Sequence, residues 1–598
     1  MTDADDARIG HEYDVVIMGG GPAGSTLGAL LAKRSDLRVA IFEKEIFPRE
    51  HIGESFAHPL VPVLEESGAL AKVMASECWV KKYGGIYNWD HGRPRVAYFD
   101  HNNVMDDGVY RWSMHVNRLE FDKILLDHAA ASGVDVVEGL DVIAFDSDSD
   151  GCTITLRGGR TVRAKYFVDA SGRRNSIAAK AKRQQLSDYR NIAIWQHFLG
   201  GLPAQGLDGD WNIFRSENLS PIACFAFSDG WCWYIPVPKI VDGERKLTHS
   251  VGVVTDPIIL RESGTDLTDQ ATFIKTVREI PILRDLIQDA EPVAPTMLTA
   301  TNYSMINERF ADYDQRWILV GDAAYFVDPL FSSGVAFATT QASATALLLR
   351  STLTGGLSEQ QQRDLWQDYD VGWHGMAETF ALSIDQWYHA IRKNNPDSIY
   401  WKSRVAHEGA DLGIQERTFD ALLNTAFTPD LLVLMTGGTG RMSDLDQDGP
   451  FIRGSAQAEP DLAAPTGSIV LAEGVVARGS VGLDVPGFKA FIPPAPFEIP
   501  PSLKAAITEY WKDPVADGAR MPAPLDAPIP SRRFGFADRP ETPEIAGLDR
   551  DGAGELASLL QNGGVGVGEV EQRLSFTQQQ LLKRLARAGM VTVIGNTT

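Results

Sequence analysis

The arrangement of hydrophobic and polar positions predicts a strand, a helix and a second strand at the start of the chain. Residues 14–18 and 38–43 are short apolar runs typical of buried strands, and residues 22–33 carry apolar side chains at helical spacing. Two such strands joined by a helix form the basic unit of a parallel α/β sheet. We therefore expect the chain to begin with a nucleotide-binding α/β domain.

Later segments extend this domain and interrupt it. Strand patterns return at residues 153–168, and alternating aromatic and aliphatic positions at 191–254 predict an inserted sheet that roofs a pocket. An apolar strand near Trp317 and an apolar helix at about 335–353 resume the first pattern. The first domain is therefore expected to be discontinuous.

The remainder of the chain predicts a different organisation. Residues 365–392 have a helical pattern rich in tryptophan, tyrosine and histidine, and a stretch rich in proline, glycine and alanine follows at about 436–543. We expect that stretch to wrap rather than form its own core. Two amphipathic patterns and a strand-like run end the chain and predict a small helical or winged-helix-like cap. The expected domains are 1–370, with the inserted sheet at about 80–110 and 185–300, then a helical and wrapping region at 371–545, and the cap at 546–598.

Composition and charge narrow the range of partners. The chain has 598 residues, 44% of them hydrophobic, and no apolar run long enough to span a bilayer. Its acidic start lacks the features of a secretion signal, and its net charge of -23 repels nucleic acid and anionic membranes. The four cysteines show no CxxC spacing, which argues against a zinc site and a disulfide framework. We expect a cytoplasmic protein with no metal, nucleic acid or membrane partner.

A glycine-rich turn, residues 19–24 (GGGPAG), lies between the first strand and the helix. Gly19 permits a tight turn, Gly21 lets the backbone approach a pyrophosphate, and Gly24 lets the helix pack closely. Glu43 ends the next strand and would hold ribose hydroxyls. An ordinary glycine turn would lack this context, so the pattern predicts a dinucleotide site. Its other expected members are Pro22, Ala23 and Lys44.

Three further motifs resemble those of the flavin monooxygenase superfamily and imply that the dinucleotide is FAD. Gly321 and Asp322 in GDAA follow an apolar strand and resemble the second FAD fingerprint, in which the aspartate contacts the ribityl chain. Asp169 in VDASG resembles the middle motif, and Arg118 in VNRLEFDK resembles a flavin-contacting arginine. Taken singly, each also fits a satisfied turn aspartate or a solvated arginine. The resemblance implies an α/β fold with a Rossmann-like, glutathione-reductase-type FAD domain, an inserted mixed β-sheet substrate domain and a mostly helical C-terminal region.

Two loops are expected to line the flavin pocket. Residues 47–55 (FPREHIGES) match the superfamily's loop after the second strand, although a salt-bridged surface loop explains the same residues. Residues 328–335 (DPLFSSGV) resemble the segment that ends at the isoalloxazine ring and opens a helix. The expected contacts in these loops are Arg49, Glu54, Ser55, Pro329, Gly334 and Val335.

Two motifs resemble the flavin-dependent halogenases rather than the hydroxylases of this superfamily. Residues 231–236 (WCWYIP) fit the WxWxIP pattern, whose bulky side chains shield the flavin, with an aromatic sheet core as the alternative. Residues 79–89 (WVKKYGGIYNW) resemble the segment with the halogenase lysine, which aligns with Lys82. Its neighbour Lys81 is expected at the surface. The expected shielding residues are Trp231, Trp233, Ile235 and Pro236.

The resemblance implies that reduced FAD, oxygen and chloride or bromide form hypohalous acid. Lys82 would direct this oxidant to the substrate, either as an ammonium that donates a hydrogen bond or as an amine that carries the halogen, with Ser332 beside it. Consecutive amides of Ser333 and Gly334 at a helix N-terminus form a site for the halide. Capping of that helix by Ser332 or Ser333 is compatible with this role.

One departure from the tryptophan halogenases concerns the substrate. Those enzymes have a glutamate where this chain has Phe331. The resemblance therefore favours the branch that halogenates phenols, pyrroles or carrier-bound acyl groups in natural-product and antibiotic biosynthesis. A C-terminal signature of that branch is expected to shape a wall of the site and comprises Tyr388, Asn395, Tyr400, Trp401 and Lys402.

The supply of electrons is expected to come from a partner. No second strand, GxGxxG turn and helix follows the first, so a resident nicotinamide domain is not expected. The family uses a separate flavin reductase, and the resemblance implies the same here. No aspartate suited to covalent attachment precedes the second FAD motif, so non-covalent FAD is expected.

Two other functions compete with halogenation. An NAD(P)H-dependent aromatic hydroxylase would share the FAD motifs but would leave WCWYIP and Lys82 unexplained. An FAD-bound sensor would use the basic cap residues to contact a partner or DNA, against the acidic charge of the whole chain. Dependence of turnover on halide separates the halogenase from both.

Overall fold

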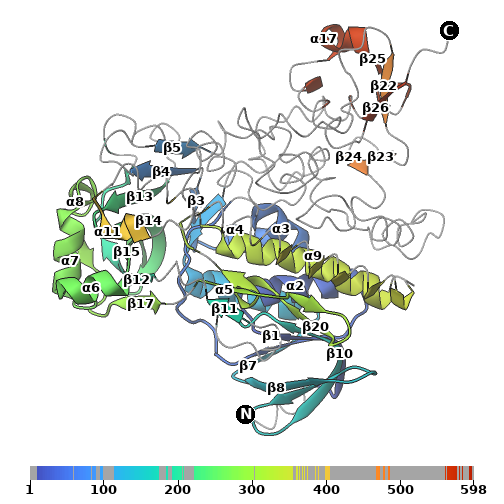
Figure 1. Ribbon diagram of the computed structural model, residues 1–598, viewed down its shortest axis with the longest axis horizontal. Helices are drawn as coiled ribbons and strands as arrows, with labels where there is room; N and C mark the ends of the chain where they lie inside the picture. The colour runs from blue at the N-terminus through green and yellow to red at the C-terminus, as the bar shows by residue number, and fades with distance from the viewer. Residues whose placement is uncertain are drawn as a thin grey trace.

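The structure is a computed structural model (Figure 1). It describes residues 10–57, 60–82, 84–88, 95–98, 113–173, 183–185, 191–204, 207, 221–301, 304–326, 328–330, 332–354, 358–360, 362–363, 366–367, 369–370, 373–374, 377, 381, 384, 388, 397–403, 467–471, 476–478, 482–484, 556, 559–560, 562–574, 578–579, 582 and 591–594. Across these residues, no helix is long and apolar enough to cross a membrane, and no group of histidine, cysteine and acidic side chains is placed to hold a metal ion. All four cysteines are buried free thiols.

A mostly parallel sheet forms the nucleotide-binding domain. In spatial order its main strands are β19 (Ala311–Asp312), β20 (Trp317–Leu319), β10 (Thr161–Asp169), β1 (Glu12–Met18), β2 (Val39–Glu43) and β7 (Asp135–Glu138). The strands from β20 to β7 run parallel, whereas β19 and the hairpin of β8 (Val142–Ser147) and β9 (Cys152–Leu156) pair antiparallel. Burial on both faces explains why the parallel strands read as continuous apolar runs.

Helices cover one face of this sheet (Figure 1). The helix α2 (Pro22–Arg34) packs against α5 (Arg118–Ala131) and α9 (Gly334–Thr354), with α3 (Leu60–Ser67) and α4 (Leu70–Ala75) nearby. Close packing needs a glycine at position 28, because a Cβ atom there would lie 2.9 Å from Cδ1 of Ile41 on β2. The helices expected at 22–33 and 335–353 are confirmed to within one residue at each end.

A second, mixed sheet combines two distant segments of the chain. Its strands, in spatial order, are β16 (Glu291–Pro292), β12 (Ile192–Leu199), β15 (Glu244–Thr255), β14 (Gly230–Val241), β13 (Ile222–Phe227), β4 (Gly84–Asn88) and β5 (Arg95–Tyr98), with β17 (Leu298–Thr301) also paired to β12. The pairing of β4 with β13 is parallel, and the other pairs are antiparallel. The expected inserted mixed sheet is therefore present.

Alternation along β14 gives the second sheet two buried faces. Trp231, Trp233 and Ile235 pack with the core of the nucleotide-binding domain. Cys232 and Tyr234 point the other way, into a separate core with side chains of α7 (Gln270–Glu279). The helices α6 (Pro257–Ser263) and α8 (Leu283–Leu286) lie along the same side as α7 (Figure 1). The WCWYIP motif thus contributes side chains to two separate cores, one on each face of the sheet.

Short elements connect the two sheets. A pair of strands, β3 (Trp79–Lys82) and β6 (Ser113–Val116), carries Lys82, and a small sheet joins β11 (Arg183–Gln185), β18 (Met305–Asn307) and β21 (Tyr325–Phe326). The one-turn helix η5 (Gly321–Ala323) follows β20. These elements bring residues from far-separated parts of the chain to one region.

The C-terminal half is described only in part. A small sheet joins β22 (Ser468–Leu471) to β25 (Val565–Gly566) and β26 (Val591–Ile594), and the turn η9 (Val567–Glu569) and helix α17 (Val570–Arg573) follow β25. Strands β23 (Val476–Arg478) and β24 (Gly482–Asp484) pair separately, and helix α11 (Ile399–Ser403) precedes them. The strand-like end of the chain is confirmed, but β22 comes from the stretch expected to wrap without a core, and its Ile469 is fully buried. The expected domain boundaries stay predictions.

Candidate active site

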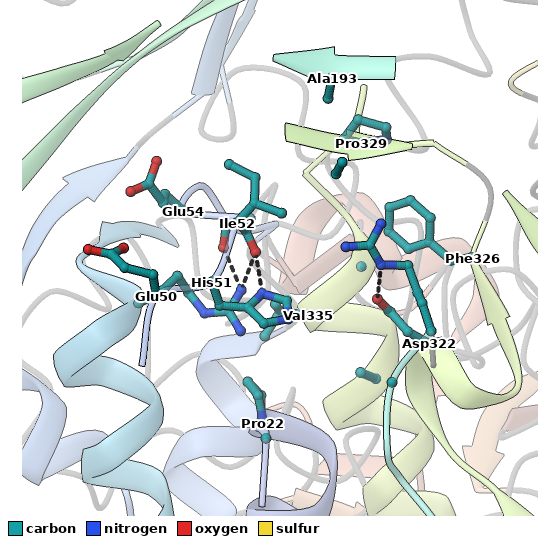
Figure 2. A pocket seen from close by; sticks show the side chains of 18 of the residues that line it. Pro22, Glu50, His51, Ile52, Glu54, Ala193, Asp322, Phe326, Pro329 and Val335 are labelled. Carbon is teal, nitrogen blue, oxygen red and sulfur yellow. Dashed lines mark hydrogen bonds and ion pairs between the residues drawn. The ribbon is translucent and has the colours of Figure 1, made fainter. Parts of the chain in front are cut away.

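A cavity of about 800 Å³ lies where the two sheets meet. Pro22 approaches it from α2, Ala193 and Pro329 from the opposite side, and Asp322 and Phe326 from one flank (Figure 2). The structure brings together most of the residues expected from the sequence. Those that line the cavity are Gly19, Gly21, Pro22, Ala23, Glu43, Lys44, Arg49, Glu54, Ser55, Arg118, Trp231, Trp233, Ile235, Asp322, Pro329, Ser332, Ser333, Gly334 and Val335.

The glycine turn places the N-terminus of α2 at the cavity. Gly19 has a φ of 105°, and a Cβ atom there would lie 2.5 Å from the carbonyl oxygen of Ala170. At Gly21 a Cβ atom would meet only Arg49, at 3.9 Å, so this position opens onto the cavity. Gly24 lies beneath the turn, where a Cβ atom would be 2.0 Å from the carbonyl oxygen of Gly19. The turn therefore depends on glycine for backbone conformation, for open space and for close packing.

Glu43 fixes the turn and faces the cavity. Its Oε2 atom accepts a hydrogen bond from the amide of Gly20 at 2.7 Å, and its Oε1 atom accepts one from the amide of Glu45 at 2.9 Å. The carboxylate is buried yet lines the cavity. Each carboxylate oxygen has further acceptor capacity, so these bonds are compatible with a ribose hydroxyl donating to the same group.

Arg118 anchors the loop that follows β2. Its Nε and Nη2 atoms donate to Asp122 at 2.7 and 2.8 Å, and its Nη1 atom donates to the carbonyl oxygens of Ile52 and Gly53 at 2.7 and 3.0 Å. Both charged side chains are buried. The bidentate pair satisfies the buried guanidinium and holds the loop against α5. Arg118 thus lines the cavity mainly as the support of its loop wall.

The GDAA segment contributes a carboxylate with a cationic neighbour. Asp322 Oδ2 lies 3.8 Å from Nε of Arg173, whose guanidinium lies 5.9 Å from the ring centroid of Phe326. All three residues line the cavity, and Figure 2 shows Asp322 and Phe326 on one flank of it. Burial raises the pKa of the Asp322 carboxyl above its ordinary range, against the opposing effect of Arg173.

Apart from Lys82, four expected residues support the cavity without lining it. Asp169 Oδ1 accepts bonds from the amide and hydroxyl of Ser171 at 3.0 and 2.6 Å, and so shapes the turn after β10. Gly321 has a φ of 65° and packs against Ala338 of α9, where a Cβ atom would lie 2.9 Å away. Gly24 acts beneath the glycine turn, and Pro236 lies on the opposite side of β14 from Ile235. Their effect on a ligand is therefore indirect.

Aromatic side chains form one wall of the cavity. The ring centroids of Trp231 and Trp233 are 6.1 Å apart, and Trp195 of β12 lies 6.3 Å from Trp233. The indole of Trp233 donates to the hydroxyl of Ser250 at 3.1 Å. Its cross-strand neighbour is Gly252, where a Cβ atom would lie 2.0 Å from the indole. The glycine therefore makes room for the tryptophan that faces the cavity.

Lys82 lies behind the cavity wall rather than in it. Its Nζ atom donates to the hydroxyl of Ser55 and to the carbonyl oxygen of Phe56, each at 2.9 Å. The hydroxyl of Ser332 donates to the same Ser55 oxygen at 3.1 Å. Ser55 and Ser332 line the cavity, and Lys82 is 1% exposed. The expected Lys82 and Ser332 pair is thus bridged by Ser55.

Lys82 and the adjacent Lys81 differ in burial, and burial changes the pKa of Lys82. Lack of water lowers the pKa of the Lys82 ammonium to about 7, with a smaller opposing effect from Cys224. Lys81 points to the other face of β3 and is only half-buried. The contrast expected between adjacent strand positions is present.

The segment before α9 is held by a buried polar network. Asp328 Oδ2 accepts from the hydroxyl of Tyr388 at 2.8 Å and from the side-chain Nδ2 of Asn191 at 3.1 Å. The hydroxyl of Tyr400 donates to Oδ1 of Asn191 at 3.3 Å. Asp328 Oδ1 accepts from the amide of Leu330 at 2.9 Å. Tyr388 and Tyr400 thereby support the wall, as expected of the C-terminal signature. Trp401 packs on both tyrosines, the side chain of Lys402 is not among those described, and Phe331 and Asn395 lie outside the described residues.

The residues expected to bind the halide lie at the start of α9. Ser332 adopts a φ of 58°, which turns the chain, and the amide of Phe337 donates to the carbonyl oxygen of Ser333 at 2.8 Å. Ser333 and Gly334 both line the cavity at this helix N-terminus. The partial positive charge of a helix start favours an anion there.

Trp195, His197 and Arg173 are among the cavity residues that sequence reasoning missed. Trp195 and His197 alternate on β12, and Arg173 follows the VDASG motif. The period-two pattern of β12 could have placed Trp195 and His197 on one face. Their position at the cavity depends on pairing of β12 with β15, which no local pattern specifies.

The residues present fit FAD. The cavity volume is within the range of cofactor sites. Gly21 leaves space for a pyrophosphate at the start of α2, and the carboxylates of Glu43 and Asp322 line the cavity as acceptors for hydroxyl groups. Hydrogen bonds and helix dipoles would hold the cofactor without a covalent bond.

Comparison with known proteins agrees with this site. The family model described as tryptophan halogenase matches residues 100–418, and the model described as FAD dependent oxidoreductase matches residues 14–183. The chain is 28% identical to a tryptophan 2-halogenase of Chondromyces crocatus over 75% of this chain and 80% of that protein. It is 34% identical to the 1H-pyrrole-2-carbonyl-[peptidyl-carrier protein] chlorinase of Pseudomonas fluorescens over 56% of this chain and 74% of that protein.

Solved structures show the same fold. The myxobacterial chondrochloren halogenase CndH superposes with a TM-score of 0.57 at 28% identity, covering 69% of this chain and 89% of that chain. The flavin-dependent halogenase CmlS gives a TM-score of 0.59 at 24% identity, covering 98% of this chain and 96% of that chain. The family model spans more than half of the sequence. The chain therefore belongs to the FAD-dependent halogenases, the oxidoreductase family that the tryptophan halogenase model describes.

Proposed function

We propose that this halogenase forms hypohalous acid at the cavity and that Lys82 directs it onto the substrate. The observation that carries the proposal is the hydrogen-bonded series from Lys82 Nζ to Ser55 and Ser332, which connects a buried lysine to two hydroxyls of the cavity wall. Bound FAD, when reduced, supplies the electrons that activate oxygen. The chain itself positions the halide, guides the oxidant and excludes water.

The protonation of Lys82 suits this task. Because burial lowers its pKa to about 7, the ammonium and the amine are both populated near neutral pH. The ammonium donates a hydrogen bond to the neutral oxidant, and the amine can take the halogen on Nζ. Hydrogen bonds to Ser55 and Phe56 fix Nζ in either form. A surface lysine such as Lys81 lacks this environment.

The start of α9 is the proposed halide site. The amides of Ser333 and Gly334 are at the N-terminus of a 21-residue helix and line the cavity. The tryptophan wall of Trp231 and Trp233 lies on the same cavity and would keep the organic substrate from direct contact with the flavin. The oxidant then reaches the substrate by way of the Lys82 region.

The proposed substrate is an electron-rich aromatic compound, free or tethered to a carrier protein, in a natural-product pathway. The carrier-dependent activity in the name of the Pseudomonas relative supports the tethered form. The name of the Chondromyces relative supports an indole, while Phe331 in place of the tryptophan halogenase glutamate supports a phenol or pyrrole. A separate flavin reductase is proposed to supply reduced FAD.

One assay tests the proposal. The purified protein receives reduced FAD, oxygen and bromide with a free phenol, an indole or a pyrrolyl carrier protein, and products are read by mass spectrometry. We expect a brominated product that depends on bromide and, when NADPH is the electron source, on an added flavin reductase. A hydroxylated product without halide dependence, formed with NADPH alone, would contradict it.

A further inference from the structure

A buried carboxylate and a histidine meet at the cavity, away from Lys82. Oε1 of Glu54 lies 2.6 Å from Nε2 of His197, and the two side chains are 3% and 7% exposed. Both residues line the cavity. Among the described residues, the second oxygen of Glu54, Oε2, has no direct hydrogen-bond partner, and the nearby hydroxyl of Ser250 helps to lower the pKa of the carboxyl. A buried carboxylate with an open acceptor atom at a cavity is a costly arrangement unless a ligand or a proton uses it.

The surroundings keep the Glu54 carboxylate ionised. Burial alone would raise its pKa, but the neighbouring His197 and Lys239 outweigh burial and leave the pKa below its ordinary value. A short hydrogen bond to an ionised carboxylate requires a proton on Nε2 of His197. Other ionisable groups around the pair are Glu50 and His51 of the same loop, His115 at the bridge between β6 and Ser55, Arg118 of α5 and Lys239 of β14.

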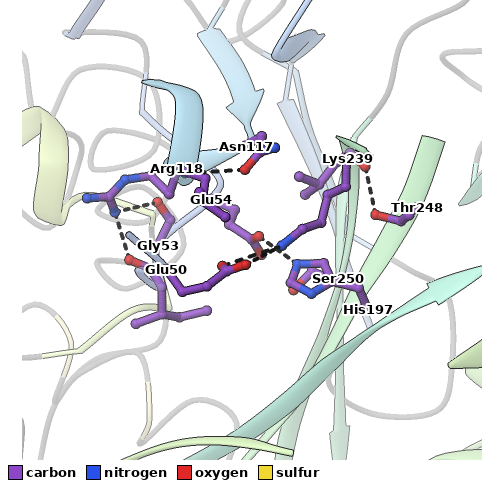
Figure 3. Close-up of polar contacts among 12 residues, drawn as sticks. Glu50, Gly53, Glu54, Asn117, Arg118, His197, Lys239, Thr248 and Ser250 are labelled. Carbon is purple, nitrogen blue, oxygen red and sulfur yellow. Dashed lines mark hydrogen bonds and ion pairs between the residues drawn. The ribbon is translucent and has the colours of Figure 1, made fainter. Parts of the chain in front are cut away.

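Two charged side chains, Lys239 and Glu50, lie on the solvent side of the buried pair. Lys239 extends from β14 toward the carboxylates of Glu50 and Glu54 (Figure 3). Its Nζ atom lies 3.3 Å from Oε1 of Glu50, whose side chain is 52% exposed. His197 is paired in register with Ser250 of β15, which fixes the backbone of His197 within the second sheet. Lys239 is thus paired with an exposed carboxylate and acts on Glu54 through its charge.

Halogenation requires a source of protons at the cavity. The net reaction converts R–H, a halide ion, oxygen, reduced FAD and a proton into R–X, oxidised FAD and two molecules of water. Oxygen accepts two electrons from reduced FAD and two from the halide and the broken C–H bond. The proton lost from carbon and those of reduced FAD do not suffice for two waters, so a further proton must enter. A cavity that excludes water needs a protein group to deliver it.

We propose that Glu54 and His197 form an internal proton donor that resupplies the cavity during each turnover. The imidazolium of His197 keeps its Nε2 proton in the hydrogen bond to Glu54 and delivers its Nδ1 proton to oxygen formed in the cavity. Glu54 stabilises the imidazolium, and a proton from solvent restores it before the next turnover. The pair serves the halogenation of the family and is independent of the role proposed for Lys82.

The variants His197→Gln and Glu54→Gln test this role. Glutamine at 197 retains an N–H donor for Glu54 but cannot titrate, so it separates proton transfer from structure. The matched control is His249→Gln, because His249 is a buried histidine of β15 that stacks on Tyr234 and does not line the cavity. Two readouts are used: halogenation rate as a function of pH, and the protons exchanged when FAD binds, from calorimetry in buffers of different ionisation enthalpy. FAD removes water from the cavity, which changes the proton affinity of a pair that lines it.

We expect His197→Gln to bind FAD like the parent and to lose the share of the proton exchange that belongs to His197. Its halogenation rate should be about 10² times lower, because a positioned proton donor typically accelerates a reaction by a factor of about 10² to 10⁴. Glu54→Gln should lose the same proton exchange. If His197→Gln does not fold, the proton exchange and the halogenation rate of Glu54→Gln test the proposal in its place. His249→Gln should keep the parent's pH profile. Parent-like rate, pH profile and proton exchange in either pair variant would overturn the proposal. Lys82→Ala should retain the part of the proton exchange that His197→Gln removes and should lose halogenation, so the two proposals fail separately.

Discussion

The Nζ atom of Lys82 lies 2.9 Å from the hydroxyl oxygen of Ser55, and it is Ser55, not Lys82, that lines the cavity. The lysine therefore contacts the cavity wall through a serine. Ser332 donates to the same oxygen from the segment before α9. The resulting series joins β3, the loop after β2 and the start of α9 at one point, which explains how distant segments cooperate at the proposed site.

Ser55→Ala removes the group that joins Lys82 to Ser332. We expect FAD binding to persist and the yield of halogenated product per reduced FAD consumed to fall about tenfold, because a buried charged donor loses one partner. The measurement compares product with reduced FAD oxidised. Ser67→Ala is the matched control, since Ser67 is also buried but donates to Leu64 away from the cavity. An unchanged yield in Ser55→Ala would show that the series is not used.

The lowered pKa of Lys82 predicts a pH dependence of stability. Unfolded lysine holds its proton to about pH 10.4, whereas folded Lys82 releases it near pH 7. Between these values the unfolded state binds more protons, so stability rises with pH by at most about 1.4 kcal/mol per pH unit. We expect the free energy of unfolding of the parent, measured by urea denaturation without FAD, to rise from pH 7 to 9 relative to Lys82→Met. Parallel curves for the two proteins would contradict the assignment.

Much of this site could be predicted from local sequence patterns, but the hydrogen bonds between its distant residues could not. The glycine turn and Glu43 are set by one βαβ unit, so their roles follow from about 25 residues of sequence. Lys82 was identified by its motif, and the alternation of β3 separates it from Lys81. Ser55 was expected only as a cofactor contact, because its bond to Lys82 arises from tertiary packing 27 residues away.

Longer-range relationships were beyond sequence reasoning for a physical reason. Glu54 and His197 are separated by 143 residues and meet because the loop after β2 packs under the second sheet. His197 belongs to no motif, and an isolated histidine in a strand gives no indication of its partner. The pairing of β22 with β25 and β26 was not predicted for the same reason, because tertiary packing rather than local pattern determines which strands pair.

Gly21→Val should abolish FAD binding while the protein stays folded. The position faces open space in the cavity, and a branched side chain would occupy the room that the pyrophosphate needs. Gly568→Val is the control, because a Cβ atom there meets nothing within 4 Å and the residue is not part of the cavity. Flavin absorbance of the desalted proteins measures occupancy. Full occupancy in Gly21→Val would refute the site.

Gly252→Val should displace Trp233 from the cavity wall. A Cβ atom at 252 would lie 2.0 Å from the indole, and overpacking of this kind costs about 1–3 kcal/mol. The smaller ring in Trp233→Phe should relieve the strain, so the double variant is expected to be more stable than the sum of the single effects. Thermal or urea unfolding of the four proteins measures the coupling. Additive effects would show that the two residues do not touch.

The central claim is that Lys82 directs the oxidant, and comparison of Lys82→Ala with Lys81→Ala tests it most directly. Both proteins are supplied with the same reduced FAD, oxygen, bromide and aromatic trap, and the rate of enzyme-directed bromination is measured beside FAD occupancy. We expect Lys82→Ala to bind FAD but to brominate about 10² to 10³ times more slowly than the parent, as for loss of a charge-assisted donor at a reacting centre, while Lys81→Ala stays active. Bromination at the parent rate by Lys82→Ala would contradict the account.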